Sequence, residues 1–288
     1  MKNMPVKKRK KKFSWGWFFT YAVMLVLVCF TSLPLVYLVV TAFKPLDELF
    51  VYPPQFFVKK PTLNNFYDLF TTMDSTVVPF TRYIFNSLLT TMATVFGAVA
   101  VCSMGAYAVE KVRLPGGKLI FNIVVSALMF SPPAAQIPIF IAVSRLGMID
   151  TYWALIIPNL AVPMYFFLFK QFIGDIPQAL IESAIIDGAG VFGRYVHVVL
   201  PLLKPAIATV SVFAFINNWN NAGGSMVYIT SQAMKTLPYA ISSISDGSIA
   251  RAGAGAAAVL LVTLPTIVYY LIQQKKVINT MAYAGIKG

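Results

Sequence analysis

The sequence predicts an all-α integral membrane protein. Hydrophobic residues make up 58% of its 288 residues and charged residues only 11%, and the mean hydropathy is +0.73. Soluble domains carry about a quarter charged residues. The apolar residues are gathered into runs close to the ~20 residues that a helix needs to cross a bilayer. Because a chain in lipid must satisfy its own backbone hydrogen bonds, each run is predicted to be a helix.

Six such runs predict six transmembrane helices, over residues 17–43, 83–109, 119–143, 153–172, 202–219 and 252–272. Prolines interrupt two of them: Pro132, Pro133 and Pro138 lie in the third run, and Pro158 and Pro163 in the fourth. Proline removes a backbone donor and clashes with the preceding turn, so these helices are expected to be kinked or broken. Broken helices can line a pathway, or neighbouring helices can absorb the kinks, and the sequence favours neither alternative.

The distribution of charge orients these predicted spans. Seven of the 23 cations fall in the first twelve residues, and the apolar run that follows is longer than the ~7–15-residue core of a cleaved signal. With residues 1–16 as a cytosolic tail, 16 cations and four acids lie inside, against seven cations and six acids outside. Both termini are therefore expected in the cytosol. Because the outer face is then nearly neutral, the formal charge of +13 indicates neither nucleic acid nor an anionic substrate.

The sequence lacks the motifs that indicate several chemical functions. It has no G-x-x-x-x-G-K-[ST] phosphate loop, so it is not expected to hydrolyse nucleotide itself. The small residues from Gly253 to Ala258 open an apolar run, where they favour close helix packing over dinucleotide binding. The single His197 and the two cysteines, Cys29 and Cys102, suggest neither a catalytic nor a metal site. The chain is expected to carry no cofactor, and its spans lack the ionisable residues of an ion-driven transporter.

The segment 173–201, between the fourth and fifth runs, is predicted to be a cytosolic helix–turn–helix. Pro177 suits the first turn of a helix, and Gly188 permits a left-handed turn. A second short helix is expected from there to Leu200-Pro201. The apolar residues of the first helix recur on one face: Ile176, Leu180, Ile181, Ala184 and Ile185. Such a loop is either a solvated connector or an element that docks into a cytosolic partner.

The letters of this loop resemble the EAA motif of ABC importer permeases. Glu182-Ser183-Ala184, three residues, Gly188, nine residues, Val198, one residue and Leu200-Pro201 keep its spacing, with Ser183 and Val198 in place of alanine and isoleucine. Other segments resemble the maltose-permease-like carbohydrate permeases of the second-subunit type: Asn86-Ser87, Ala106-Tyr107-Ala108, Pro138, Leu146-Gly147, Asp187-Gly188-Ala189, Trp219-Asn220, Thr236-Leu237-Pro238 and the final Gly285 to Gly288. The family more often ends in Gly-Ala-Val-Lys-Gly.

This resemblance implies a MetI-like permease fold over residues 17–288 and a set of partners. A second homologous permease, two cytosolic ABC ATPase subunits that hold ATP and magnesium, and an extracellular solute-binding protein are expected in a bacterial plasma membrane. The residues implied in ATPase coupling are Glu182, Ser183, Ala184, Asp187, Gly188, Ala189, Leu200, Pro201, Lys287 and Gly288. The outer loop 217–251 is the expected contact for the binding protein, and 273–288 the cytosolic tail.

The solute itself is expected to be an oligosaccharide. Asn159, Asn217 and Trp219 offer the amide and aromatic surfaces that sugars favour, although each also suits packing between helices or capping of a helix end. An ABC permease for a non-sugar solute is the alternative within the same class. A membrane channel or enzyme whose cytosolic loop is only a connector is the alternative from a different class.

Overall fold

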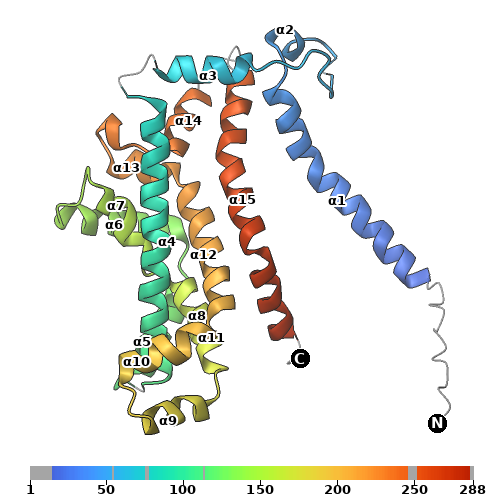
Figure 1. The fold of residues 1–288 in the computed structure, drawn as a ribbon. Coiled ribbons are helices and arrows are strands. Elements are labelled where there is room, and N and C mark those ends of the chain that lie inside the picture. The colour runs from blue at the N-terminus through green and yellow to red at the C-terminus, as the bar shows by residue number, and fades with distance from the viewer. Residues whose placement is uncertain (1–14, 54, 75–77, 113, 246–251, 286–288) are drawn as a thin grey trace, which may run out of the picture.

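The computed structural model describes residues 15–53, 55–74, 78–112, 114–245 and 252–285 of the chain, and this part is helical, without strands (Figure 1). The α-helices are α1 (Trp15–Ala42), α2 (Leu46–Leu49), α3 (Asn64–Asp74), α4 (Phe80–Glu110), α5 (Gly117–Ala127), α6 (Pro132–Arg145), α7 (Tyr152–Ile156), α8 (Pro163–Gly174), α9 (Gln178–Ile186), α10 (Val191–Arg194), α11 (Leu200–Leu202), α12 (Lys204–Trp219), α13 (Ala222–Tyr228), α14 (Leu237–Ser245) and α15 (Ala252–Gly285). Short 3₁₀ turns lie at η1 (Ile157–Asn159) and η3 (Gln232–Met234), and η2 (Tyr195–Val199) is a π-helical segment.

The core is a bundle in which α4 packs against α8 and α12, and α12 packs against α15. Small residues allow these helices to approach closely: Ala98 and Ala106 of α4, Ala206 and Ala214 of α12, and Ala257 and Ala258 of α15 are fully buried. At the outer end of α15, Gly253 leaves the space that the side chain of Asn65 fills. That amide in turn donates to the backbone oxygens of Ala42 and Lys44. The small residues of this segment thus serve helix packing, as the sequence predicts.

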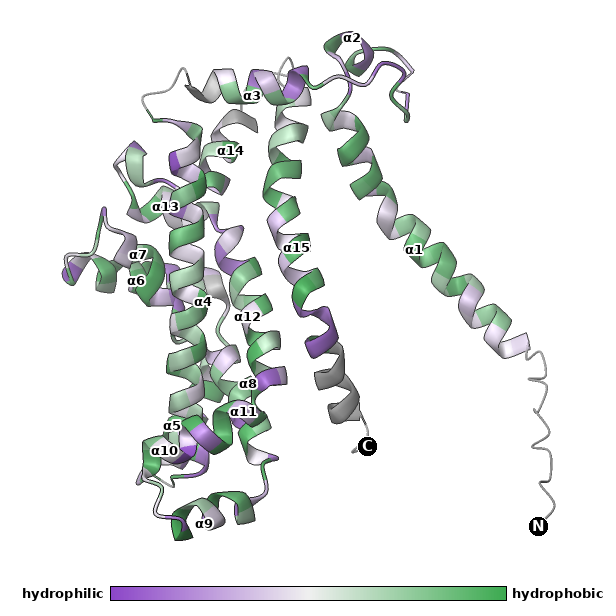
Figure 2. Cartoon of the chain, in the orientation of Figure 1, coloured by the Kyte–Doolittle hydropathy of each residue, from purple (hydrophilic) through white to green (hydrophobic). Residues whose placement is uncertain are grey.

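Helix α1 stands apart from this bundle. It meets α15 only near its carboxyl end and then diverges from it (Figure 1). Its surface is apolar along its length (Figure 2), and Thr41 and Ala42 are its only buried residues. A helix that is apolar all round and uncovered by its own chain is suited to lipid or to another membrane helix.

The predicted spans are confirmed to different degrees. Among the described residues three helices are long and apolar enough to cross a membrane, over Trp15–Ala42, Phe80–Glu110 and Ala252–Val277. The fourth span consists of Tyr152–Asn159 and Pro163–Gly174, bent by 42° between Pro158 and Pro163. The third is interrupted between α5 and α6, directly before Pro132. The interruptions predicted at Pro132 and between Pro158 and Pro163 are confirmed, whereas α6 continues through Pro138. Six crossings remain a prediction.

The fifth predicted span begins after a sharp turn. Helix α12 follows the Val191–Leu202 helix with a bend of 80° at Leu203. In Figure 1, α9 lies at the bottom of the molecule and the first turn of α1 and the last turn of α15 lie in its lower half, whereas α2, α3 and α14 lie toward the top. The 173–201 loop, the start of α1 and the end of α15 therefore lie toward the same side of the molecule. Which side of a membrane this is stays a prediction.

Candidate functional site

The first helix of the loop ends in a Schellman turn built around Gly188. Helix α9 runs to Ile186, and the amide of Gly188 donates to the oxygen of Ile185 at 3.0 Å while the amide of Ala189 donates to the oxygen of Ala184 at 2.9 Å. Gly188 has φ +80°, in the left-handed region where a Cβ is costly. This confirms the predicted turn. It also explains the spacing between Ala184 and Gly188, because these residues occupy fixed positions of one motif.

The surface of α9 combines a buried stripe with an exposed apolar tip. Ile181 and Ala184 lie at the centre of the predicted apolar face and are buried, whereas Leu180 and Ile185 lie at its edges and are half exposed. Ile186 is 86% exposed on the opposite, polar side, and the sequence analysis did not single it out. The exposed polar residues of α9 and its turn are Gln178, Glu182, Ser183 and Asp187. A large exposed apolar side chain beside carboxylates is suited to a protein partner.

The second helix of the loop contains a π turn. Its Tyr195–Val199 segment is π-helical, and both Tyr195 and Val199 are buried. Pro201 follows within the same helix, and its missing amide removes one α-helical donor. The helix continues through Leu202, so the exit into α12 lies at Leu203, two residues beyond the predicted boundary at Leu200-Pro201. Leu200 is half-buried and Pro201 exposed.

One face of α4 holds both arms of the loop. Ser103, Tyr107 and Lys111 recur every four residues and therefore lie on the same side of the helix. The hydroxyls of Ser103 and Tyr195 are 2.7 Å apart and buried. The Tyr107 hydroxyl donates to the oxygen of Val191 at 3.3 Å, and its ring packs on that of Tyr195. The Lys111 ammonium donates to the oxygen of Ile176 at 2.8 Å. We call Ser103, Tyr107 and Lys111 the α4 stripe.

An ion pair extends these contacts to two more helices. The Glu110 carboxylate lies 2.8 Å from the Lys170 ammonium of α8. The same ammonium lies 4.1 Å above the ring of Phe121 in α5. The loop is therefore attached to α4, and the end of α4 is attached to α5 and α8. The pairing of Ser103 with Tyr195 bridges 92 positions of sequence, and no periodicity in the sequence indicates it.

At the opposite end, a polar cluster holds the 217–251 segment, which the sequence predicts to be the outer loop. The Asn86 amide is fully buried; its nitrogen donates to the oxygens of Ala233 and Lys235, and its oxygen accepts from the Tyr152 hydroxyl at 2.7 Å. The neighbouring Ser87 hydroxyl accepts from the amide of Leu237 at 2.7 Å. The Asn86-Ser87 and Thr236-Leu237-Pro238 segments, quoted separately above, are thus bonded to each other.

A second clamp on the outer loop comes from Asp150, between α6 and α7. Its carboxylate accepts from the amides of Ser231 and Thr230 at 2.8 and 2.9 Å, and its own amide donates to the oxygen of Tyr228. Asp150 holds a left-handed backbone, φ +61°, which costs free energy in a residue other than glycine. The hydrogen bond from the Ser231 amide is the main cause that lowers the pKa of this carboxyl below its ordinary value.

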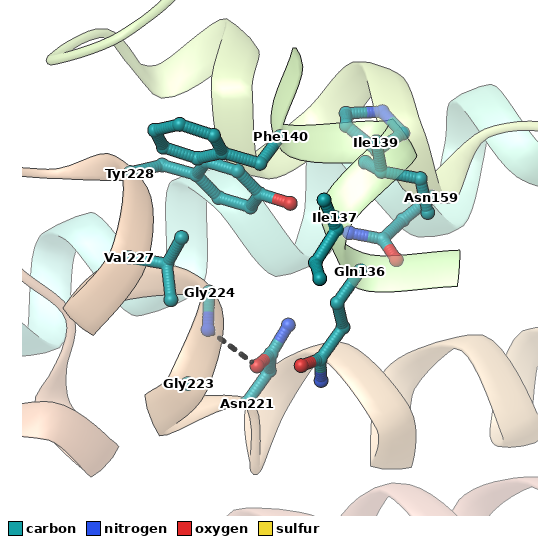
Figure 3. Close-up of a pocket in the computed structure, with 11 residues that line it drawn as sticks. Gln136, Ile137, Ile139, Phe140, Asn159, Asn221, Gly223, Gly224, Val227 and Tyr228 are labelled. Carbon is teal, nitrogen blue, oxygen red and sulfur yellow. Dashed lines mark hydrogen bonds between the residues drawn. The ribbon is translucent and has the colours of Figure 1, made fainter. Parts of the chain in front are cut away.

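The three residues predicted for the solute pathway lie in different environments. Asn159 lines an open cavity of about 380 Å³ between α6, η1 and α13 (Figure 3). Asn217 is exposed, and its amide donates to the Tyr165 hydroxyl at 3.0 Å. The Trp219 side chain is 1% exposed; its indole donates to the oxygen of Val262 and stacks on Phe215. The structure thus gives Trp219 a place in the packed core.

Comparison with known proteins assigns the chain to a family. Residues 113–276 match the family described as the binding-protein-dependent transport system inner membrane component. The chain belongs to this family. The matched region includes the whole 173–201 loop, Asp150 with the outer-loop segment that it holds, and the cavity. Lys287 and Gly288, also expected in coupling, lie outside both the match and the described residues.

Some relatives of this permease are carbohydrate transport proteins by name. The polygalacturonan/rhamnogalacturonan transport system permease protein YtcP of Bacillus subtilis (strain 168) is 30% identical over 72% of this chain and 80% of its own. The arabinooligosaccharides transport system permease protein AraQ of the same organism is 28% identical over 72% and 74%. A crystal structure of a bacterial ABC transporter involved in the import of the acidic polysaccharide alginate has a chain with the same fold, at a TM-score of 0.79 and 20% identity, covering 92% of this chain and 99% of that one.

Membership places the permease in a membrane as a transport component. In the part of the chain that the structure describes, no three metal-ligating side chains gather. Three features of that part are candidates for a functional site: the loop with its α4 stripe, the clamped 217–251 segment and the cavity around Asn159.

Proposed function

We propose that this permease is a transmembrane subunit of an ATP-driven, binding-protein-dependent importer of oligosaccharides. It forms half of the translocation pathway together with a second, homologous permease, crosses a bacterial plasma membrane six times and has both termini in the cytosol. Two ABC ATPase subunits supply the energy, and an extracellular binding protein delivers the solute. Support comes from family membership, from the carbohydrate names of two relatives, and from the loop letters at intact spacing.

The shape of the 173–201 loop is the observation that carries this proposal. Its tip is held rigidly by the Schellman turn at Gly188, yet it exposes Ile185, Ile186 and Phe192 together with Glu182. Exposed apolar side chains on a rigid protruding helix need a complementary surface to cover them. We propose that each ATPase subunit offers that surface as a groove for α9.

The α4 stripe explains how movement of the loop reaches the bundle. Because Lys111 holds the start of the loop and Ser103 with Tyr107 holds its second helix, the loop cannot tilt without pulling on α4. Closure of the ATPase dimer on ATP would thus move α4 with α8 and open the pathway outward. Asn159 and Asn217 are the residues that we propose to face the solute, and the clamped outer loop is the proposed contact for the binding protein.

Substitution at Gly188 tests the proposal. No atom lies within 4 Å of a Cβ built on Gly188, so a substitution acts through backbone strain rather than through a clash. Gly188→Val, β-branched in a left-handed conformation, is expected to lose most ATPase binding and ATP-driven uptake. Gly188→Asn is the matched control, because asparagine tolerates this conformation.

The measurements are co-purification of the ATPase with the permease and uptake of labelled oligosaccharides by vesicles that contain the whole complex. Both should fall in Gly188→Val and remain in Gly188→Asn, with equal amounts of permease in the membrane. A channel or enzyme whose loop is only a connector would keep its activity in both variants, and that result would refute the proposal.

A further inference from the structure

The cavity around Asn159 lies where the helices are interrupted. Gln136 and Phe140 come from α6, Pro158 and Asn159 from η1, and Tyr228 from the end of α13. These elements lie on the side of the bundle away from α1 and α15 (Figure 1). The volume of about 380 Å³ falls within the ~300–1,000 Å³ typical of small-molecule sites. The sequence left open whether the interrupted helices line a pathway or pack against neighbouring helices, and in the structure they line an open pocket.

One wall of the cavity is aromatic. The rings of Phe140 and Tyr228 stack at a centroid distance of 6.3 Å and an angle of 14°, and Figure 3 shows them side by side above the polar residues. Ile137 and Val227 extend this apolar surface. A flat wall of this kind suits the C–H faces of a sugar ring, whereas the hydroxyls of the ring need polar partners at its edge.

The polar residues supply a fixed acceptor and a fixed donor. The Asn159 nitrogen uses one of its two hydrogens on the oxygen of Leu155 at 2.8 Å, which leaves its side-chain oxygen as an acceptor and its second N–H as a donor for a ligand. The Asn221 oxygen caps α13 by accepting from the amide of Gly224 at 2.8 Å, so its nitrogen is left free. Gln136 adds a donor and an acceptor at the edge of the cavity (Figure 3). The two asparagines come from different segments, and their backbone partners assign which end of each amide faces the cavity.

We propose that this cavity binds one ring of an uncharged sugar as the solute passes through the permease. A sugar hydroxyl both donates and accepts, so it matches a cavity that offers acceptors and donors together. A carboxylate carries a charge, and a cation is what would offset the cost of removing that charge from water. None of the residues that line the cavity is Lys, Arg or His, and the Asn159 oxygen would repel an anion. The inference rests on the proposed function, and it narrows the solute to neutral oligosaccharides at this position.

Asn221→Asp is the most selective test that the chain offers. Aspartate caps a helix as well as asparagine does, so the bond to the amide of Gly224 is kept and α13 should fold unchanged. The only atom replaced is the free nitrogen that faces the cavity, which becomes a charged acceptor. Asn220→Asp is the matched control, because Asn220 lies one position away, is exposed, and donates to the oxygen of Ile216 in its own helix.

The assay is ATP-driven uptake by vesicles that contain the complete transporter and its binding protein. The probes are labelled arabino- and malto-oligosaccharides as neutral solutes and galacturonate oligosaccharides as acidic ones. We expect the wild type to take up a neutral probe, Asn221→Asp to reduce that uptake by roughly tenfold or more, and Asn220→Asp to stay within about twofold. Phe140→Leu, which keeps the apolar bulk and removes the flat ring, should reduce it as well.

The outcomes separate this inference from the function on which it rests. Uptake of acidic probes alone by the wild type would overturn the inference and leave the importer function intact. If both Asn221→Asp and Phe140→Leu take up the neutral probe at the wild-type rate, the inference is likewise overturned and the importer function stands. If the wild-type permease transports no glycan and the ATPase does not co-purify with it, the proposed function is overturned, and this inference with it.

Discussion

The buried contact between Ser103 and Tyr195 allows a prediction that is worked out from the hydrogen-bond network. The Ser103 hydroxyl donates to the oxygen of Val99 at 2.6 Å, one turn earlier in α4. Its single hydrogen is thereby used, so the Tyr195 hydroxyl must be the donor in the 2.7 Å contact with Ser103. Removing one partner therefore has a different consequence from removing the other.

The magnitudes follow from what each substitution leaves behind. Ser103→Ala leaves the Tyr195 hydroxyl buried without an acceptor, which costs about 2 kcal/mol. Tyr195→Phe leaves Ser103 still bonded to Val99, so the cost is the net value of one hydrogen bond, about 1 kcal/mol. The double variant leaves no unsatisfied donor and should cost about 1 kcal/mol, well below the sum of the single changes. The slightly higher helix propensity of alanine, about 0.5 kcal/mol, is common to both proteins that carry Ser103→Ala and cancels in the cycle.

The thermal midpoint of the purified transporter in lipid–detergent measures these costs. For a chain of this size, 1 kcal/mol corresponds to roughly 2–4 °C, so Ser103→Ala should lower the midpoint by about 6 °C and Tyr195→Phe by about 3 °C. Tyr270→Phe is the control, because its half-exposed side chain lies on α15, away from the loop. Additive effects within about 0.5 kcal/mol would refute the coupling of the two residues. Equal costs of the single changes would refute the assigned direction of the bond.

Three further predictions concern the ends of the bundle. Asn86→Ala leaves the buried Lys235 oxygen and the Tyr152 hydroxyl without this partner, whereas the Ala233 oxygen keeps its bond from Arg82. The change should therefore destabilise the protein by about 2–4 kcal/mol and expose the 232–237 segment to limited proteolysis. Backbone hydrogen bonds lower the pKa of Asp150 from 3.8, so its contribution to stability is complete above pH 3.8 and is lost as the pH falls through the lower pKa of the folded protein. Protection of the outer loop from hydrogen exchange should fall over the same pH range, and Asp150→Asn should abolish this pH dependence. Glu110→Gln breaks a pair that is only partly buried, so the change in thermal midpoint should correspond to less than about 1 kcal/mol and vanish in about 1 M salt.

Local chemistry made part of this structure predictable from sequence. Gly188 could be assigned a left-handed turn because a helix that ends there needs a residue without a Cβ, and the structure has it at φ +80°. Pro132 and Pro158 mark helix interruptions for an equally local reason, the missing amide. The packing role of Gly253 and the alanines after it followed from their place at the start of an apolar run.

Contacts between distant segments could not be predicted in this way. The attachment of Tyr195 to Ser103 depends on how two helices meet, and neither residue is unusual within its own helix. Trp219 is a residue whose burial could not be predicted from sequence. Its indole suits a sugar, but the packing of α12 against α15 buries it, and burial is a property of the assembled bundle. Asn159 lines the cavity from the 3₁₀ turn that separates α7 from α8, and the position of that turn beside α6 and α13 is set by the assembled bundle.

Helix α4 connects the two ends at which this permease is proposed to act. At one end the α4 stripe holds the loop, and at the other Asn86 and Ser87 hold the outer loop. Ser87 and Ser103 lie sixteen positions apart, about 24 Å along a continuous helix. A continuous helix transmits displacement along its axis with little bending, because every turn is tied to the next by backbone hydrogen bonds. The Tyr152 hydroxyl on Asn86 connects the same helix to α7, which leads into the cavity wall at η1. Movement of the loop would therefore reach the outer loop and the cavity through one helix, whereas α1, which packs mainly against α15, need not move with it.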